Sequence, residues 1–230
     1  MLSTYTYPKF EYVCPPEVAE QRSGHYPVVI VGAGPVGLSM AIDLAAQGQQ
    51  VLLLDNDDTV SIGSRGVCYA KRTLEVLDRL NCGAPAVEKG VSWNVGRTFF
   101  GDGEVFNFNL CPQEGHQRPG MVNLQQYYLE DYLVARARQL PNLEMRFKNN
   151  VISVEQDDAQ ATVRVETPDG AYTLTTDWLV AADGARSPIR TMLGLDIEGK
   201  IFMDRFLIAD VVMKADYPAE RWFWFDPPFH

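Results

Sequence analysis

YPVVIVGAGPVGLSMAIDLAAQGQQVLLLD, residues 26–55, contains most of the information about the architecture of this chain. An apolar run at 28–31 leads into a glycine-rich turn. A segment of small and apolar residues then continues to Ala46, and a second apolar run at 51–54 ends in Asp55. This order predicts a strand, a tight turn, a helix and a second strand. The expected fold class is α/β, with a Rossmann-like domain on a parallel sheet.

The glycine-rich turn consists of Gly32, Ala33, Gly34, Pro35, Val36 and Gly37. Each glycine has a separate purpose in this pattern: Gly32 makes the tight turn, Gly34 lets the backbone approach a pyrophosphate, and Gly37 lets the helix lie close to the strand. Pro35 suits the first helical turn, where its missing N–H removes no hydrogen bond. A phosphate would bind at the free N–H groups of this helix, the positive end of its dipole.

Asp55 completes the pattern at the end of the second strand. A carboxylate at this position can accept hydrogen bonds from both hydroxyls of an adenosine ribose. The strand, the turn, the helix and the acid together predict binding of a dinucleotide. The alternative is a glycine-rich turn in an ordinary α/β domain, with Asp55 as a solvated strand end.

The composition narrows the class of protein. The 230 residues are 46% hydrophobic and 22% charged, which is typical of a globular protein with a substantial core. The formal charge of −10 argues against a nucleic acid or an anionic membrane as partner. We find no apolar run of membrane-spanning length and no secretion signal at the N-terminus. The four cysteines are scattered, without metal-ligand spacing, and indicate a reduced cytoplasmic protein.

Arg65 is a second candidate for the nucleotide site. It follows the second strand on the side of the sheet where the glycine turn lies, so its side chain can reach the same phosphates. The alternative is an ion pair with Asp55, Asp57 or Asp58. Arg72, by contrast, is expected to form a salt bridge on the surface of a helix or between domains.

Gln126 stands in the first turn of a helix expected at 123–139, where its amide can face a bound ligand. It could equally form a hydrogen bond at the start of the helix. Another helix is expected at 71–80, because leucines recur there at helical spacing. Residues 56–64 are polar and rich in turn formers, so a loop is expected there.

A second glycine-containing motif follows a predicted buried strand at 178–182. Asp183 and Gly184 end this strand, and Arg186, Ser187 and Arg190 lead into a helix start. An acid and a glycine at the end of a buried strand form a second place where a nucleotide can be bound. Shorter strands at 143–147, 151–154, 161–166 and 171–175 are expected to form a strand and an antiparallel meander crossing over the main sheet.

The remaining segments suggest three regions. Residues 1–25 have no sustained periodicity and are expected to run over the surface as an arm. Residues 26–92 and 119–195 form the nucleotide-binding domain. Residues 93–118, which contain a predicted hairpin, and 196–230, with β-like stretches at 201–212 and 221–225, form part of a second sheet. The aromatic residues of the hairpin could line a substrate pocket, although packing within the sheet is the favoured interpretation for each one.

With these motifs the chain resembles the single-component FAD-dependent aromatic hydroxylases, the p-hydroxybenzoate hydroxylase family, and within it the branch of 3-(3-hydroxyphenyl)propionate hydroxylase. The resemblance covers residue 27 to the C-terminus. It implies that residues 32–37 hold the FAD pyrophosphate, that Asp55 binds the adenosine ribose and that Arg65 lies near the pyrophosphate. It further implies that Gln126 lies on the flavin side, that the backbone at Val151 meets the adenine, and that Asp183 and Gly184 serve FAD and a transient nicotinamide nucleotide.

The resemblance also implies an activity: NADH or NADPH reduces the flavin, and one oxygen atom of O₂ is transferred to a small aromatic substrate such as a phenol. The cofactor carries this chemistry, and we find no metal-ligand pattern and no residue that can be named as a catalytic acid or base. A later glycine–aspartate motif of the family is missing, so the chain is expected to be the N-terminal part of a longer hydroxylase. Two alternatives to this function remain: another FAD oxidoreductase, such as a reductase or a halogenase, and a non-catalytic flavin-binding fragment. The oligomeric state is also left open, with a homodimer as one possibility.

Overall fold

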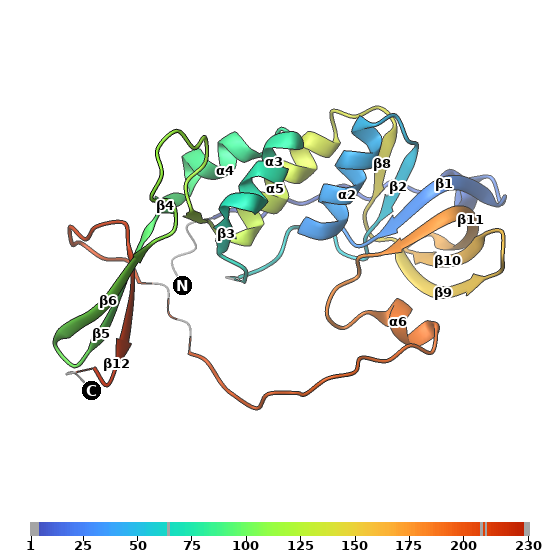
Figure 1. Cartoon of the computed structure of the whole chain (residues 1–230). Helices are drawn as coiled ribbons and strands as arrows, with labels where there is room; N and C mark the ends of the chain where they lie inside the picture. The colour runs from blue at the N-terminus through green and yellow to red at the C-terminus, as the bar shows by residue number, and fades with distance from the viewer. Residues whose placement is uncertain (1–4, 64, 208, 210, 228–230) are drawn as a thin grey trace.

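The computed structural model describes residues 5–63, 65–207, 209 and 211–227. Its main sheet has six strands in the order β8, β2, β1, β11, β10, β9 (Figure 1). These strands are β1 (Gly24–Val31), β2 (Val51–Leu54), β8 (Leu143–Arg146), β9 (Asn150–Gln156), β10 (Ala161–Thr167) and β11 (Gly170–Ala181). The first four in the order run parallel, whereas β10 and β9 are antiparallel to their neighbours. The predicted α/β class is confirmed.

The apolar runs of β1 and β2 are buried on both faces of the sheet, which explains their uninterrupted apolar sequences. In β1, Val28 and Ile30 belong to a core beneath the helices, whereas Val29 and Val31 face a second core on the other side of the sheet. The residues of β2 alternate between the same two cores. The sheet therefore holds the end of β1, where the glycine turn begins, between two packed layers.

Four helices lie over one face of the sheet or extend from it (Figure 1). They are α2 (Pro35–Ala46), α3 (Lys71–Arg79), α4 (Gly83–Lys89) and α5 (Gln126–Ala137). The predicted leucine stripe of α3 is confirmed, since Leu74, Leu77 and Leu80 are buried. The predicted start of α5 at Asn123 is wrong, because Asn123 ends strand β7 (Met121–Asn123). That strand pairs with both β3 (Cys68–Ala70) and β4 (Val91–Trp93), so the helix begins only at Gln126.

The meander at 150–181 differs from the expectation in two respects. The strands expected at 171–175 and 178–182 are one strand, β11, whose first half pairs with β10 and whose second half pairs with β1. The expectation that 178–182 is buried is also wrong, since Trp178 is 72% exposed. The reason is that Ala161, the first residue of β10, lies opposite Thr176, so the residues of β11 after Thr176 are paired with β1 only.

A separate three-stranded sheet contains β5 (Val95–Phe100), β6 (Gly103–Asn109) and β12 (Arg221–Phe225). The predicted hairpin is therefore present as β5 and β6, which are antiparallel. Phe99 stacks on Trp224 of β12, with ring centroids 4.9 Å apart, so its ring packs within this sheet. Figure 1 shows the segment after α6 (Pro188–Met192) running from the main sheet to this smaller one.

The β-like interpretation of residues 201–212 is wrong for the described residues of that range, none of which lies in a strand. Ile201 and Leu207 are 85% and 95% exposed. An apolar sequence forms a strand only where a neighbouring strand accepts its backbone hydrogen bonds, and no described strand lies beside this segment. Within the described part of the chain, no helix combines the length and the apolar character needed to span a bilayer.

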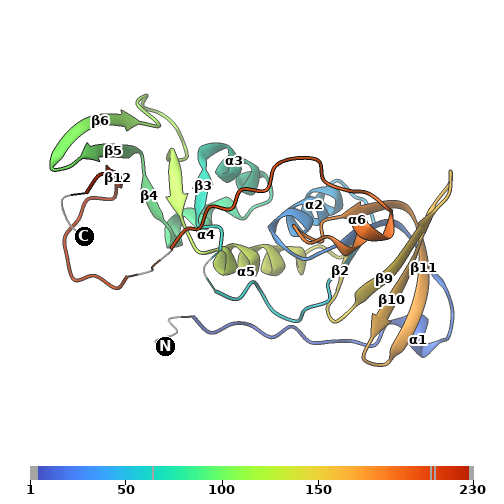
Figure 2. The same ribbon diagram turned by 90° about the horizontal axis from the view of Figure 1, so that it is seen from below.

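The N-terminal arm is more structured than the sequence suggests. Residues Pro16–Ala19 form a short helix, α1, and the arm runs past α5 and β2 towards it (Figure 2). Phe10 is buried and stacks on Phe147, while Glu17 of α1 is buried beside Arg146 of β8. An aromatic pair and an ion pair, both distant in sequence, therefore hold the arm against the sheet.

Candidate functional site

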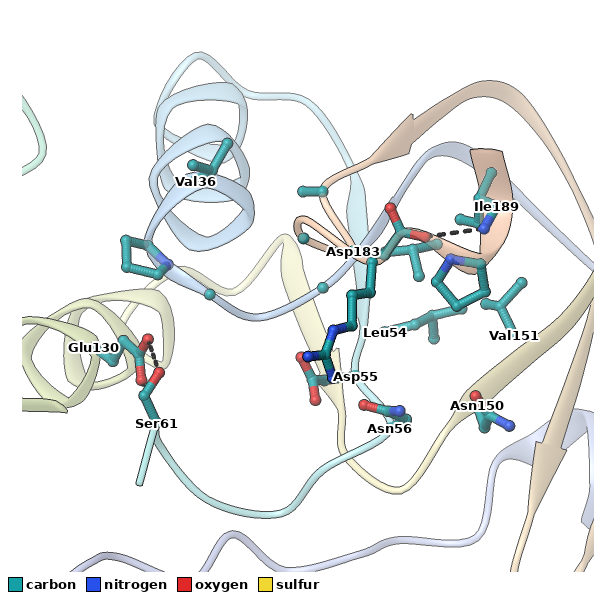
Figure 3. A pocket seen from close by; sticks show the side chains of 18 of the residues that line it. Val36, Leu54, Asp55, Asn56, Ser61, Glu130, Asn150, Val151, Asp183 and Ile189 are labelled. Atoms are coloured by element: carbon teal, nitrogen blue, oxygen red, sulfur yellow. Dashed lines mark hydrogen bonds between the residues drawn. The ribbon is translucent and has the colours of Figure 1, made fainter. Parts of the chain in front are cut away.

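An open pocket of about 480 Å³ lies where β1, β2 and β11 end (Figure 3). The carboxyl ends of these parallel strands meet at one edge of the sheet, where α/β proteins commonly bind ligands. Ten of the twelve predicted site residues line it: Gly32, Gly34, Pro35, Val36, Asp55, Arg65, Gln126, Val151, Asp183 and Gly184. The other two, Ala33 and Gly37, belong to the same turn, where the Ala33 N–H donates to Asp55 and Gly37 packs against the carbonyl of Gly32. The structure therefore brings the predicted residues together.

The three glycines of the turn have different surroundings. Gly32 has a φ of +108°, and a Cβ there would lie 2.7 Å from the carbonyl carbon of Ala182. A Cβ on Gly37 would overlap the carbonyl oxygen of Gly32, so α2 approaches the turn too closely for any side chain. A Cβ on Gly34 would meet nothing within 4 Å. Gly32 and Gly37 thus shape the turn, whereas Gly34 leaves space in the pocket.

Asp55 connects the end of β2 to this turn. Its Oδ2 accepts a hydrogen bond from the Ala33 N–H at 2.5 Å, and its Oδ1 accepts one from the Asp57 N–H at 2.7 Å. Burial raises the pKa of the Asp55 carboxyl above its usual range, although these two N–H groups oppose the shift. The interpretation as a solvated strand end is therefore wrong for Asp55, because its carboxylate braces the turn and lines the pocket.

Two arginines supply positive charge to the pocket. Arg65 and Arg186 both line it, and neither forms an ion pair or a hydrogen bond with the residues that the structure describes. Among the described residues, Arg65 forms none of the ion pairs that were the alternative, with Asp55, Asp57 or Asp58. Asp58 pairs instead with Lys9 and Lys148. Arg72 forms its expected salt bridge on the helix surface, with Glu75.

Gln126 lines the pocket and also forms hydrogen bonds at the start of α5. It is the first residue of α5 and lines the pocket, and its side chain also fastens a loop. Its Oε1 accepts from the Gly66 N–H at 3.3 Å, while its Nε2 donates to Ser61 Oγ at 3.0 Å and to Glu130 Oε1 at 2.7 Å. The amide therefore connects α5 to the loop that carries Arg65.

Asp183 holds the start of α6. Its Oδ2 accepts from Ser187 Oγ at 2.7 Å and from the Ile189 N–H at 3.0 Å, the second bond being drawn in Figure 3. Ser187 caps the helix by accepting from the Arg190 N–H at 3.0 Å. Gly184, with a φ of +87° and open space at its Cβ position, lets the chain turn beside the pocket. This motif thus fixes the wall opposite Asp55.

Sequence reasoning missed several residues that line the pocket, among them Asn56, Ser61, Glu130, Asn150 and Ile189. Asn56 directly follows Asp55 and Asn150 directly precedes Val151, so both could have been found as neighbours of predicted residues. Glu130 lies one helical turn after Gln126, and this spacing was a usable signal. Ser61 carried no signal, since its place depends on contacts with α5.

Comparisons with known proteins agree with this geometry. The family model described as FAD binding domain matches residues 25–227. The chain is 34% identical over 187 residues to para-nitrophenol 4-monooxygenase of Pseudomonas sp. (strain WBC-3), covering 80% of this chain and 46% of that protein. It is 32% identical to 3-(3-hydroxy-phenyl)propionate/3-hydroxycinnamic acid hydroxylase 2 of Burkholderia vietnamiensis, covering 80% of this chain and 34% of the relative.

Solved structures give the same result. The crystal structure of p-nitrophenol 4-monooxygenase PnpA from Pseudomonas putida DLL-E4 matches 77% of this chain and 46% of its own, with a TM-score of 0.72 and 31% identity. The ternary complex of aklavinone-11 hydroxylase with FAD and aklavinone matches 75% of this chain and 35% of its own, with a TM-score of 0.63 and 30% identity. The chain spans less than half the length of these relatives.

Proposed function

Because the chain belongs to the family of FAD-binding domains, we propose that it is the FAD-holding portion of a monooxygenase that hydroxylates a phenolic ring. The observation that supports this most is the pocket itself, where the glycine turn, Asp55 and the Asp183–Gly184 motif meet. The relatives named as hydroxylases of phenolic compounds support the choice of substrate class.

The residues of the pocket fit FAD. Any residue other than glycine at position 34 would place a side chain in the open space beside the turn. Because position 34 is a glycine, this space is available to a pyrophosphate. No side chain caps the N-terminus of α2, whose free N–H groups favour an anion. Arg65 and Arg186 line the pocket without an acidic partner among the described residues, and their charges suit the two negative charges of a pyrophosphate.

Bound FAD would supply the redox chemistry, accepting reducing equivalents from NADH or NADPH and passing one oxygen atom of O₂ to the aromatic ring. The side chains of this chain bind and orient. In this proposal Asp55 accepts hydrogen bonds from the adenosine ribose, residues 32–37 and Arg65 hold the pyrophosphate, and Val151 lies at the adenine. Gln126 lies on the flavin side, and Asp183 and Gly184 form the wall where a nicotinamide nucleotide would approach.

The other parts of the chain extend this proposal. We assign the small sheet of β5, β6 and β12 to the beginning of a substrate domain, because it stands apart from the pocket and is rich in aromatic residues. The formal charge of −10 and the scattered cysteines support a cytoplasmic protein that acts on a small aromatic molecule.

Consumption of NADH or NADPH by the protein with FAD, with and without a panel of phenols, tests the proposed activity. Stimulation by a phenol, with a hydroxylated product identified by mass spectrometry, is the expected result. Bound FAD without any phenol-dependent oxidation would instead favour a non-catalytic flavin-binding protein.

Asp55→Ala is expected to weaken FAD binding by about 1 to 3 kcal/mol, the range for leaving buried hydrogen-bonding partners unsatisfied. The substitution removes the acceptor for the Ala33 N–H and the proposed acceptor for the ribose. Titration of the apoprotein with FAD, followed by flavin fluorescence, measures the change. Asp57→Ala is the matched control in the same loop, and a change within about 0.5 kcal/mol is expected for it. Equal affinities for Asp55→Ala and wild type would contradict the assignment.

A further inference from the structure

Residues 61–66 lie in the loop between β2 and β3, and this segment, which carries Arg65, is fastened at both of its ends to one helix. Ser61 begins the segment and Gly66 ends it, and both contact side chains from the first two turns of α5. The contacting residues are Glu130 and Gln126, which the helix places four residues apart on one face. The loop and the helix therefore form one unit beside the pocket.

Glu130 holds the first end. Its side chain is buried, with the residue only 2% exposed. Oε2 accepts from the Ser61 N–H at 2.5 Å, and Oε1 accepts from Ser61 Oγ at 2.6 Å (Figure 3). Hydrogen bonds to an ionised carboxylate are about twice as strong as those between neutral groups. The buried Glu130 carboxylate thus accepts hydrogen bonds from both the backbone N–H and the side-chain hydroxyl of Ser61.

Gln126 holds the second end, and Glu130 fixes Gln126. The Gln126 amide donates to Glu130 Oε1 at 2.7 Å, which leaves its own carbonyl oxygen directed to the Gly66 N–H at 3.3 Å. The Gln126 amide also donates to Ser61 Oγ at 3.0 Å, and that hydroxyl in turn donates to Glu130 Oε1, so both acceptors of the amide depend on the carboxylate at position 130. Glu130 therefore acts on both ends of the loop.

Arg65 precedes Gly66 directly and lines the pocket without a protein partner of its own among the described residues. Its position consequently depends on the backbone at Gly66 rather than on an ion pair. We propose that Glu130 is a positioning residue that fixes Arg65 for the FAD pyrophosphate, acting through Ser61 and Gln126. This inference rests on the proposed function, because it needs FAD in this pocket.

A double-mutant cycle on FAD affinity tests the inference. Glu130→Gln and Arg65→Met are each expected to raise the Kd for FAD about tenfold, equal to about 1.4 kcal/mol. If Glu130 acts through Arg65, the double variant binds within about twofold of Arg65→Met alone, whereas independent effects would multiply to about a hundredfold. Glu155→Gln is the control, because Glu155 is an exposed carboxylate on β9 with no hydrogen bond or ion pair to the described residues, and we expect an unchanged Kd.

Two further measurements keep the test independent of folding defects and of cofactor uptake. Ser61→Ala removes one donor from Glu130, and we expect a smaller rise in Kd with the same lack of additivity. Amide hydrogen exchange of the apoprotein is expected to speed up at both Ser61 and Gly66 in Glu130→Gln, although Gly66 makes no contact with Glu130. Unchanged exchange at Gly66, or full additivity of Glu130→Gln with Arg65→Met, would overturn this inference and leave the proposed function in place. Failure of the wild-type chain to bind FAD would overturn the proposed function together with it.

Discussion

Gly34→Val is expected to abolish FAD binding while leaving the fold unchanged. Gly34 has φ −77° and ψ −180°, an extended conformation that valine adopts without strain. A Cβ there would meet no protein atom within 4 Å, so the added side chain would occupy the open pocket. Because that space is assigned to the pyrophosphate, we expect the Kd to rise more than a hundredfold, which corresponds to about 2.7 kcal/mol.

Melting temperature and FAD titration together measure this result. Gly103→Val is the matched control, since Gly103 lies at the start of β6 and a Cβ there would make only an ordinary contact 3.7 Å from the carbonyl oxygen of Phe100. The control is expected to bind FAD as the wild type does. Gly34→Val with wild-type affinity would show that the pyrophosphate lies elsewhere.

Arg146→Met is expected to destabilise the chain by about 3 to 5 kcal/mol, the range for removing one partner of a buried ion pair. Arg146 Nη1 lies 2.9 Å from Glu17 Oε2, and the two side chains are 4% and 0% exposed. Burial alone would raise the pKa of Glu17, but hydrogen bonds from Tyr26 and Arg146 keep it below its usual value. The carboxylate thus stays charged and would lose its main counter-charge.

Urea unfolding, followed by circular dichroism, measures this loss. Arg164→Met is the control, because Arg164 is exposed on β10 and its removal should change stability by no more than about 0.5 kcal/mol. The double variant Glu17→Leu, Arg146→Met should recover much of the loss, since apolar replacements of both partners leave no buried charge. A loss for Arg146→Met no larger than that of the control would contradict the role assigned to this pair in holding the arm.

The local features of this fold could be predicted from the sequence, because each depends on neighbouring residues. The glycines of the turn and Asp55 follow one another within a single strand–turn–helix–strand unit, and the leucines of α3 repeat at helical spacing. The proximity of this unit to Asp183 and Gly184 could also be predicted, since parallel strands bring their carboxyl ends to one edge of the sheet.

Features that depend on distant contacts could not be predicted in the same way. The attachment of the N-terminal arm requires Glu17 to meet Arg146, 129 residues away. The fastening of the loop at Ser61 requires Glu130 on α5, 69 residues away. The apolar sequence at 201–212 predicts a strand, but a strand forms only where a neighbour is present. In each case the sequence shows one partner without indicating the other.

The central claim is that the glycine turn, Asp55 and the Asp183–Gly184 motif form an FAD site. The visible absorption spectrum of the purified chain after incubation with FAD and gel filtration tests it most directly, with mass spectrometry of the released cofactor. We expect flavin absorption bands and about one FAD per chain. A folded, colourless protein that does not retain added FAD would contradict the claim.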